Sequence, residues 1–224
     1  MYNVYITNYK NGNSVITSWT KIFGVPANDD NGFPVVSPSV KDSEDNAASF
    51  DFSMEMNSPY YDAFMHLKTL VAVEYDGDYI FFGRVLTIDN STVYQTKRVH
   101  CEGAFGFMND THYEGVTEKD KQKISWSTYY DRIINNHNTM VQTRSPEKGI
   151  LRGTVTIDGN TAFVPTTEER KYEPSNWTQT GSLISSLVSE FGGHAIVRYR
   201  SGRNYLDWYK YYARDLGVNR PTRS

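Results

Sequence analysis

The sequence has little of what crosslinks a protein, anchors it in a membrane or exports it. Its 224 residues include one cysteine, Cys101, and one cysteine cannot form a disulfide bridge within the chain. No segment approaches the roughly 18 consecutive apolar residues of a membrane-spanning helix. Residues 1–10 also lack the basic start and the apolar core of a secretory signal. We therefore expect synthesis in the cytoplasm, no insertion into a membrane, and a fold that depends on packing.

Excess positive charge and the common catalytic motifs are missing as well. Lys and Arg number 23 against 26 Asp and Glu, so the net charge of −3 gives no reason to expect a face that binds nucleic-acid phosphates. The sequence contains no GxSxG segment, phosphate-binding loop or dinucleotide fingerprint, and neither HExxH nor CxxC. Aromatic residues, in contrast, make up 14% of the chain, with 17 Tyr. Tyr buries its ring and keeps its hydroxyl hydrated, which suits strands and contact surfaces.

Residues 2–103 read as a series of β-strands. The β-rich segments 2–6 and 14–23 flank Asn11-Gly12, a strong hairpin signal, and residues 24–48 read as a loop with a short strand at its centre. Residues 50–56 alternate between apolar and polar side chains over seven positions, which predicts a strand with one wet face. Ser58 and Pro59 then open a short helix or turn.

The segment 79–89 forms a predicted hairpin with residues 70–75 through Asp76-Gly77-Asp78. Alternation places Phe82 and Ile88 on one face of this strand and Phe81 on the other. Because both faces are apolar, we expect the strand to be covered on both sides, as in a barrel that carries a helix or a partner.

Helical patterns appear after residue 113. Residues 124–138 and 180–191 carry apolar side chains at i, i+3, i+4 and i+7, which predicts two amphipathic helices, the second ended by Gly192-Gly193. Residues 153–164 read as a hairpin that turns at 158–160, and residues 195–212 as a last hairpin. The residues alone therefore predict a β-rich chain with an α+β second half.

His100-Cys101-Glu102 is the segment with the most reactive residue types. Adjacent residues of a strand point to opposite faces, so His100 and Cys101 cannot readily form a nucleophile and base pair. We expect Cys101 to share a face with Val99 as a small buried hydrophobic residue.

Metal and acid–base chemistry have equally little support. The five histidines are scattered, and three or four ligands would have to converge from unrelated segments to bind zinc. They are His66, His100, His112, His137 and His194. The acidic residues 28–32 resemble a calcium loop, but its first and twelfth ligand positions fall on Ala27 and Pro38. Asp207, among aromatic residues, could contact a sugar, although such a strand more often simply alternates between core and water. We therefore expect no catalytic, cofactor-binding or metal-binding residues.

The order of segments in residues 45–158 resembles the N-terminal region of phage minor structural proteins. These are the tail hub, or tail-associated lysin, proteins of siphophages and of prophages in Gram-positive bacteria. The resemblance rests on an alternating strand that ends in NSPYYDAF (57–64), a hydrophobic strand, FFGRV (81–85) and CEGAFGFMNDT (101–111). The segments IINNHN (133–138) and GTVTI (153–157) also fit.

The resemblance implies a fold that is mainly β with α+β insertions, of the phage baseplate-hub type. It implies a first β-barrel-like hub domain at residues 1–112 and an α+β second domain at 113–224. Three copies would form a ring at the tail tip of the virion, made in the host bacterial cytoplasm. The partners would be the tail tube and distal tail protein on one side and a tail fibre or lysin on the other. Some relatives carry an endopeptidase domain after the hub, but nothing in these 224 residues supports peptidase chemistry.

Three hypotheses follow. The first is a structural hub protein without enzymatic activity or cofactors, assembled as a homotrimer. The second is a carbohydrate-binding tail module that contacts the host cell wall through its Tyr-rich strands. The third is a cell-wall hydrolase that uses Cys101 or the scattered carboxylates.

Overall fold

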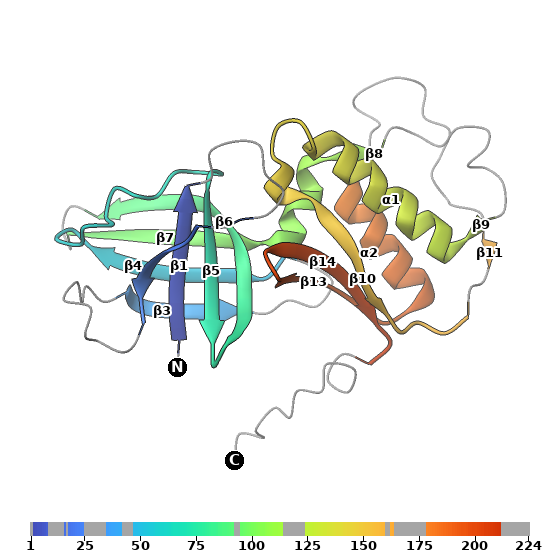
Figure 1. Ribbon diagram of the computed structural model, residues 1–224, viewed down its shortest axis with the longest axis horizontal. Coiled ribbons are helices and arrows are strands. Elements are labelled where there is room, and N and C mark those ends of the chain that lie inside the picture. Colours follow the sequence, from blue (N-terminus) through green and yellow to red (C-terminus); the bar gives the residue numbers. More distant parts are fainter. Residues whose placement is uncertain are drawn as a thin grey trace, which may run out of the picture.

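The computed structural model describes residues 2–8, 16, 18–24, 35–41, 47–91, 95–113, 124–159, 162–163 and 178–211. Seven strands form one antiparallel sheet in the order β2-β1-β5-β6-β7-β4-β3 (Figure 1). They are β1 (Tyr2–Asn8), β2 (Thr20–Phe23), β3 (Val35–Lys41), β4 (Ser49–Glu55), β5 (Thr69–Tyr75), β6 (Asp78–Ser91) and β7 (Thr96–Gly103). The sheet curls, because Ile22 of β2 and Val35 of β3, at its opposite edges, belong to the same buried cluster.

The inner face of the curled sheet holds what we call the barrel core. Alternation in β4 places Phe50, Phe52 and Met54 there, each with 1% or less of its surface exposed. The pattern predicted this face correctly, but Met56 lies beyond the end of the strand and is 61% exposed. The remaining members are Val4, Ile6, Ile22, Val35, Phe64, Val71, Val73, Phe81, Val85, Val99 and Cys101.

Two of the predicted turns are confirmed. Asp76 and Gly77 have φ angles of 49° and 92°, the two positive values that a tight hairpin requires between β5 and β6. Residues 56–62 turn without forming a helix, and the Ser58 hydroxyl accepts a hydrogen bond from the Tyr60 amide at 3.3 Å. The hairpin signal at Asn11-Gly12 lies outside the described residues, although the strands on either side of it pair antiparallel.

The predicted faces of β6 need one correction. Phe82 lies on the outer face of the sheet, as expected, but Ile88 packs against the barrel core on the inner face. The pairing shifts between Val85, opposite Cys101, and Thr87, opposite His100, so Leu86 is an extra residue in β6. An inserted residue of this kind inverts the alternation beyond it, and strict period-two counting cannot anticipate it.

The second half of the chain is a small α+β unit. A three-stranded sheet has the order β10-β14-β13, with β10 (Ile150–Val155) parallel to β14 (Arg203–Tyr209) and β13 (His194–Arg200) antiparallel to it. The helices α1 (Trp126–Val141) and α2 (Thr180–Phe191) were both predicted by their apolar stripes, and Gly192 and Gly193 end α2 with positive φ. The short elements are η1 (Ala104–Asp110), η2 (Pro146–Lys148), β8 (His112–Tyr113), β9 (Ile124–Ser125), β11 (Ala162–Phe163) and β12 (Thr178–Gln179).

The predicted hairpin at residues 153–164 is wrong. β10 pairs with β14, and β11 pairs with β9, so the two strands that flank the expected turn do not pair with each other. The local signal at Asp158-Gly159 marks a bend that carries the chain from the small sheet to the start of α1. The Trp126 indole N–H donates to the Gly159 carbonyl at that bend.

Another cluster, which we call the junction cluster, lies where the outer face of β6 meets β13. The Phe82 and Tyr199 rings stack there with centroids 4.1 Å apart, and Phe107 of η1 meets Phe82 edge-on at 6.1 Å. Its other members are Ile16, Leu70, Ala72 and Ala104. Both faces of β6 are therefore covered at residues 81–85, as the sequence predicted for this strand, whereas Tyr79 and Ile80 at its start are exposed. The proposed domain boundary at residue 112 stays a prediction.

Candidate functional site

Cys101 is a core residue. Its side chain is fully buried in the barrel core, and burial together with the Asp51 carboxylate raises the pKa of the thiol well above its ordinary value. His100 points to the opposite face, where its Nδ1 lies 2.9 Å from Asp51 Oδ1. The structure therefore separates the two residues, and a protonated, buried thiol is a poor nucleophile.

The histidines do not converge. Within the described part of the chain, no group of three or more His, Cys, Asp or Glu side chains could hold a metal ion. His137 of α1 is fully buried and sits between the Thr111 hydroxyl, at 2.8 Å, and the Lys148 carbonyl, at 2.9 Å. Because the carbonyl can only accept, Nε2 carries the proton and Thr111 donates to Nδ1. Burial lowers the pKa of His137, so the ring is neutral and structural.

A cluster of charged side chains around the buried Arg84 lies beside the junction cluster. Arg84 of β6 is 4% exposed, and its Nε donates to Glu102 at 2.6 Å while Nη2 donates to Asp110 at 2.9 Å. Lys148 donates to Asp110 at 3.0 Å from the α+β unit. Burial alone would raise the pKa of Asp110, but hydrogen bonds from Arg84 and Lys148 outweigh it and lower that pKa. These charges link β6 and β7 of the large sheet to η1 and η2, and each is paired.

The Asp207 carboxylate is also fully engaged in hydrogen bonds and ion pairs. Its carboxylate is 0% exposed and accepts hydrogen bonds from the Thr154 amide at 2.6 Å, from Arg200 at 2.8 Å and from the Tyr209 hydroxyl at 3.1 Å. The Nε of Arg198 lies 3.3 Å from its second oxygen. The carboxylate therefore has no free oxygen to offer a sugar hydroxyl, and the idea of a sugar contact at Asp207 is wrong.

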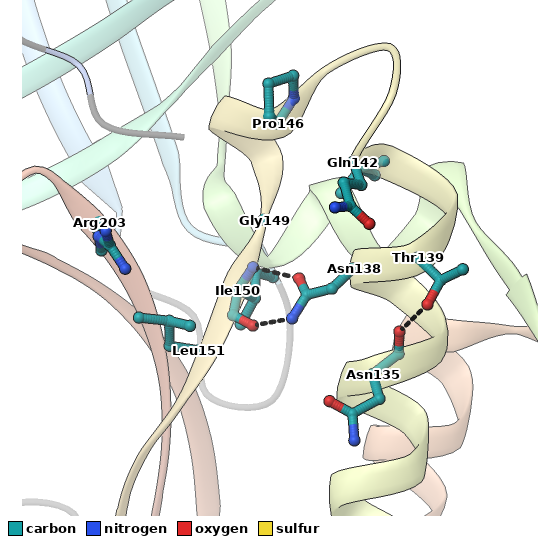
Figure 2. A pocket seen from close by; sticks show the side chains of 10 residues that line it. Asn135, Asn138, Thr139, Gln142, Pro146, Gly149, Ile150, Leu151 and Arg203 are labelled. Carbon is teal, nitrogen blue, oxygen red and sulfur yellow. Dashed lines mark hydrogen bonds between the residues drawn. The ribbon is translucent and has the colours of Figure 1, made fainter. Parts of the chain in front are cut away.

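Two cavities lie beside the strands of the small sheet. One, of about 460 Å³, lies between the C-terminal half of α1 and the start of β10 (Figure 2). Its wall includes Asn138, whose side chain donates to the Ile150 carbonyl at 2.7 Å and accepts from the Ile150 amide at 2.8 Å. This side chain therefore provides the hydrogen bonds that a neighbouring strand would provide to Ile150 of β10. Leu151 and Arg203 line the side that faces the sheet. The other cavity, of about 380 Å³, is lined by Arg152, Gly153, Thr154, Arg200, Ser201 and Tyr205.

The sequence analysis did not predict the ion pairs of Asp207 or those of Arg84. The predicted hairpin at Ser201-Gly202 fixes the register of β13 and β14 and sets Arg198 opposite Tyr205. Counting residues from that turn could therefore have predicted that Arg198 and Arg200 lie close to Asp207. No comparable local signal exists for Arg84, because its partners come from β7 and η1.

No protein-family model and no curated protein sequence matches the chain. Solved structures do match. The prophage tail protein gp18 from Listeria monocytogenes EGD-e aligns with 92% of this chain and 50% of its own length, with a TM-score of 0.52 and 12% identity. The tail protein from Neisseria meningitidis MC58 aligns over the same shares, with a TM-score of 0.50 and 12% identity. The 43 kDa tail protein of prophage MuSo2 from Shewanella oneidensis covers 92% and 53% at a TM-score of 0.48 and 11% identity.

The chain thus has the fold of phage and prophage tail proteins, and it spans about half the length of the solved structures that it matches. This confirms the fold class predicted from the sequence, mainly β with α+β parts and a curled barrel-like sheet, and it confirms the resemblance to phage tail proteins at the level of the fold. In the described part of the chain, no helix is long and apolar enough to cross a membrane.

Proposed function

We propose that this chain is a structural, non-enzymatic protein of a phage or prophage tail. The observation that carries the proposal is the match of nearly the whole chain, 92%, to prophage tail proteins of the same fold. The described residues add a consistent picture, because the reactive side chains that the sequence singled out are buried or paired. Cys101 lies in the barrel core, and Asp207 has four donors around it.

We further propose that copies of the chain assemble into a ring, with a homotrimer as the expected form, at the tip of the tail. The ring would join the tail tube and distal tail protein to a distal fibre or lysin. Two features of the curled sheet support self-assembly. Its outermost strands, β2 and β3, pair on one side only within the described residues, and unpaired strand edges are templates for pairing with another chain. Exposed aromatic side chains, Tyr2, Tyr75 and Tyr79, lie near the β5–β6 turn and supply contact area.

Light scattering on the purified chain over a concentration series tests the ring. We expect a mass that approaches three times the monomer mass, 25.7 kDa, as concentration rises. A matched variant, Val36→Lys, places a charge on the exposed edge strand β3, and we expect it to shift the equilibrium toward monomer without changing the circular dichroism spectrum. A mass that stays monomeric at every concentration, or that does not respond to changes on β2 and β3, would contradict edge-mediated assembly.

The division of the chain into 1–112 and 113–224 is also a proposal. It is supported by the barrel core, which residues 4–101 form alone, and by the cluster that α1 and α2 form over the small sheet. Phe105 and Met108 of η1 belong to the second of these clusters although they precede residue 112. Limited proteolysis followed by mass spectrometry would test it. We expect the first cuts to yield two fragments that meet near residue 112, and stable fragments with other boundaries would contradict the division.

A further inference from the structure

The outer face of the three-stranded sheet, away from α1 and α2, carries arginines around the buried carboxylate of Asp207. We call the group Arg198, Arg200, Arg203, Tyr205 and Tyr209 the arginine face. We propose that this face binds an acidic, extended peptide segment of a partner protein. The inference concerns a binding surface and does not depend on ring assembly.

The first support is that two guanidinium groups are held in place before any ligand arrives. Arg200 donates to Asp207 at 2.8 Å and lies over the Tyr205 ring at 4.8 Å. Arg198 contacts the other oxygen of Asp207 at 3.3 Å and lies over the Tyr209 ring at 5.1 Å. Side chains fixed in this way lose little conformational freedom on binding, which favours affinity.

The second support is that these groups keep unused donors. A guanidinium group has five N–H donors, and Asp207 and Tyr209 take only some of those on Arg198 and Arg200. The two side chains are 30% and 41% exposed, so their remaining donors reach solvent. Arg203, paired with Arg200 across the hairpin, is exposed as well. The three arginines Arg198, Arg200 and Arg203 and the single carboxylate of Asp207 give the arginine face a net charge of two positive units.

The third support is the shape and chemistry around the charges. Leu151, Tyr205 and Arg198 stand in register on neighbouring strands, so a chain that crosses the sheet meets an apolar, an aromatic and a cationic side chain in turn. Leu151 is 36% exposed, and Figure 2 shows it beside Arg203 at the edge of the larger cavity. The smaller cavity opens next to Arg200 and Tyr205. There is room on both sides for the flanking residues of a bound segment.

The same features favour carboxylates over a phosphate polymer. The planar guanidinium fork matches a carboxylate with two parallel hydrogen bonds, as Arg84 of this protein already does with Asp110 through Nη1 and Nη2. Binding of polyphosphate or nucleic acid instead needs a long row of Lys and Arg. This chain has a net charge of −3, and the face is only locally positive. A short acidic segment with some apolar content therefore fits best.

Fluorescence anisotropy with labelled hexaglutamate on the whole chain tests the proposal. We expect saturable binding that weakens as salt rises, and no binding of labelled hexaglutamine. Arg203→Gln should weaken binding about tenfold, the usual effect of losing one charge-assisted hydrogen bond. Lys68→Gln is the matched control, because Lys68 is an exposed cation on the other half of the chain, and it should bind as the parent does.

Arg200→Gln should also weaken binding, and circular dichroism will show whether the variant keeps its fold next to Asp207. Arg203 makes no contact with Asp207, so its substitution tests the face even where the Arg200 variant unfolds. The proposal is overturned by an absence of hexaglutamate binding, by equal losses in Arg203→Gln and Lys68→Gln, or by tighter binding of sodium polyphosphate than of hexaglutamate. Light scattering on the same samples reports assembly separately, so the failure of one proposal does not imply failure of the other.

Discussion

Truncation of Phe107 to Ala tests whether the junction cluster holds the two halves of the chain together. Phe107 is fully buried, meets Phe82 edge-on at 6.1 Å, and lies beneath the cations of Arg84 and Lys148 at 5.5 and 5.8 Å. A buried Phe→Ala change costs about 3–5 kcal/mol through lost transfer energy and the cavity that remains. Each cation over the ring adds about 0.5–1 kcal/mol. We therefore expect a loss of about 4–7 kcal/mol in the free energy of unfolding.

Urea denaturation followed by tryptophan fluorescence and far-ultraviolet circular dichroism measures this loss. The two probes should give the same midpoint in the parent chain, because both halves share the cluster. Phe107→Leu keeps most of the volume and should cost less than about 1.5 kcal/mol. Met56→Ala, at a side chain that is 61% exposed, should change the free energy by no more than about 0.5 kcal/mol. A loss below about 1 kcal/mol for Phe107→Ala would refute the view that this ring is core.

Three further changes test the buried polar groups and one close strand contact. Arg84→Met removes the guanidinium partner of Glu102 and Asp110, while Asp110 keeps Lys148. We expect a loss of about 1–3 kcal/mol in the free energy of unfolding, measured by urea denaturation, and a variant as stable as the parent would contradict a stabilising role for Arg84. Because burial lowers the pKa of His137 below its ordinary value of 6.5, the unfolded chain takes up a proton first as pH falls. The free energy of unfolding should therefore decrease as the pH falls below about 6.5, and His137 should add no pH dependence above about pH 6.5. The same titration on His137→Gln should lack that component, and an unchanged slope would show that another group causes it. A Cβ at Gly83 would overlap the Glu102 carbonyl, so Gly83→Ala should separate β6 from β7 and cost about 1–3 kcal/mol, whereas an unchanged melting temperature would contradict this close approach.

The elements that the sequence predicted well are those whose signal is local. The alternation of Phe50, Phe52 and Met54 identifies β4 because a half-buried strand needs only its own residues to show its period. The stripes on α1 and α2 are similar, and the hairpin at Asp76-Gly77 follows from the positive φ angles of its turn. Each of these depends on fewer than about 18 consecutive residues, the longest window over which such periods can be read.

The missed features all depend on residues far apart in the chain. The parallel pairing of β10 with β14 joins segments about fifty residues apart, as in Leu151 opposite Tyr205. The residues next to either strand contain no signal that predicts this pairing. The extra residue at Leu86 is invisible to a period of two. For the candidate sites, the sequence placed Cys101 in the core correctly. It could not find the cluster around Arg84, whose acidic partners follow 18 and 26 residues later.

The charged groups around the buried Arg84, which link β6 and β7 to η1 and η2, give a physical reason for a fixed arrangement of the two halves. An apolar contact such as Phe82 against Tyr199 tolerates sliding, since dispersion and burial are not directional. The bonds from Arg84 to Glu102 and Asp110, and from Lys148 to Asp110, are directional, and any displacement would leave a buried charge unpaired. The junction therefore penalises rotation of one half against the other more than an apolar interface of the same area would. The same argument predicts that Arg84→Met loosens the orientation of the halves as well as lowering stability. Small-angle scattering on that variant would detect the change as a larger radius of gyration, and an unchanged scattering curve would show that the apolar junction alone sets the arrangement.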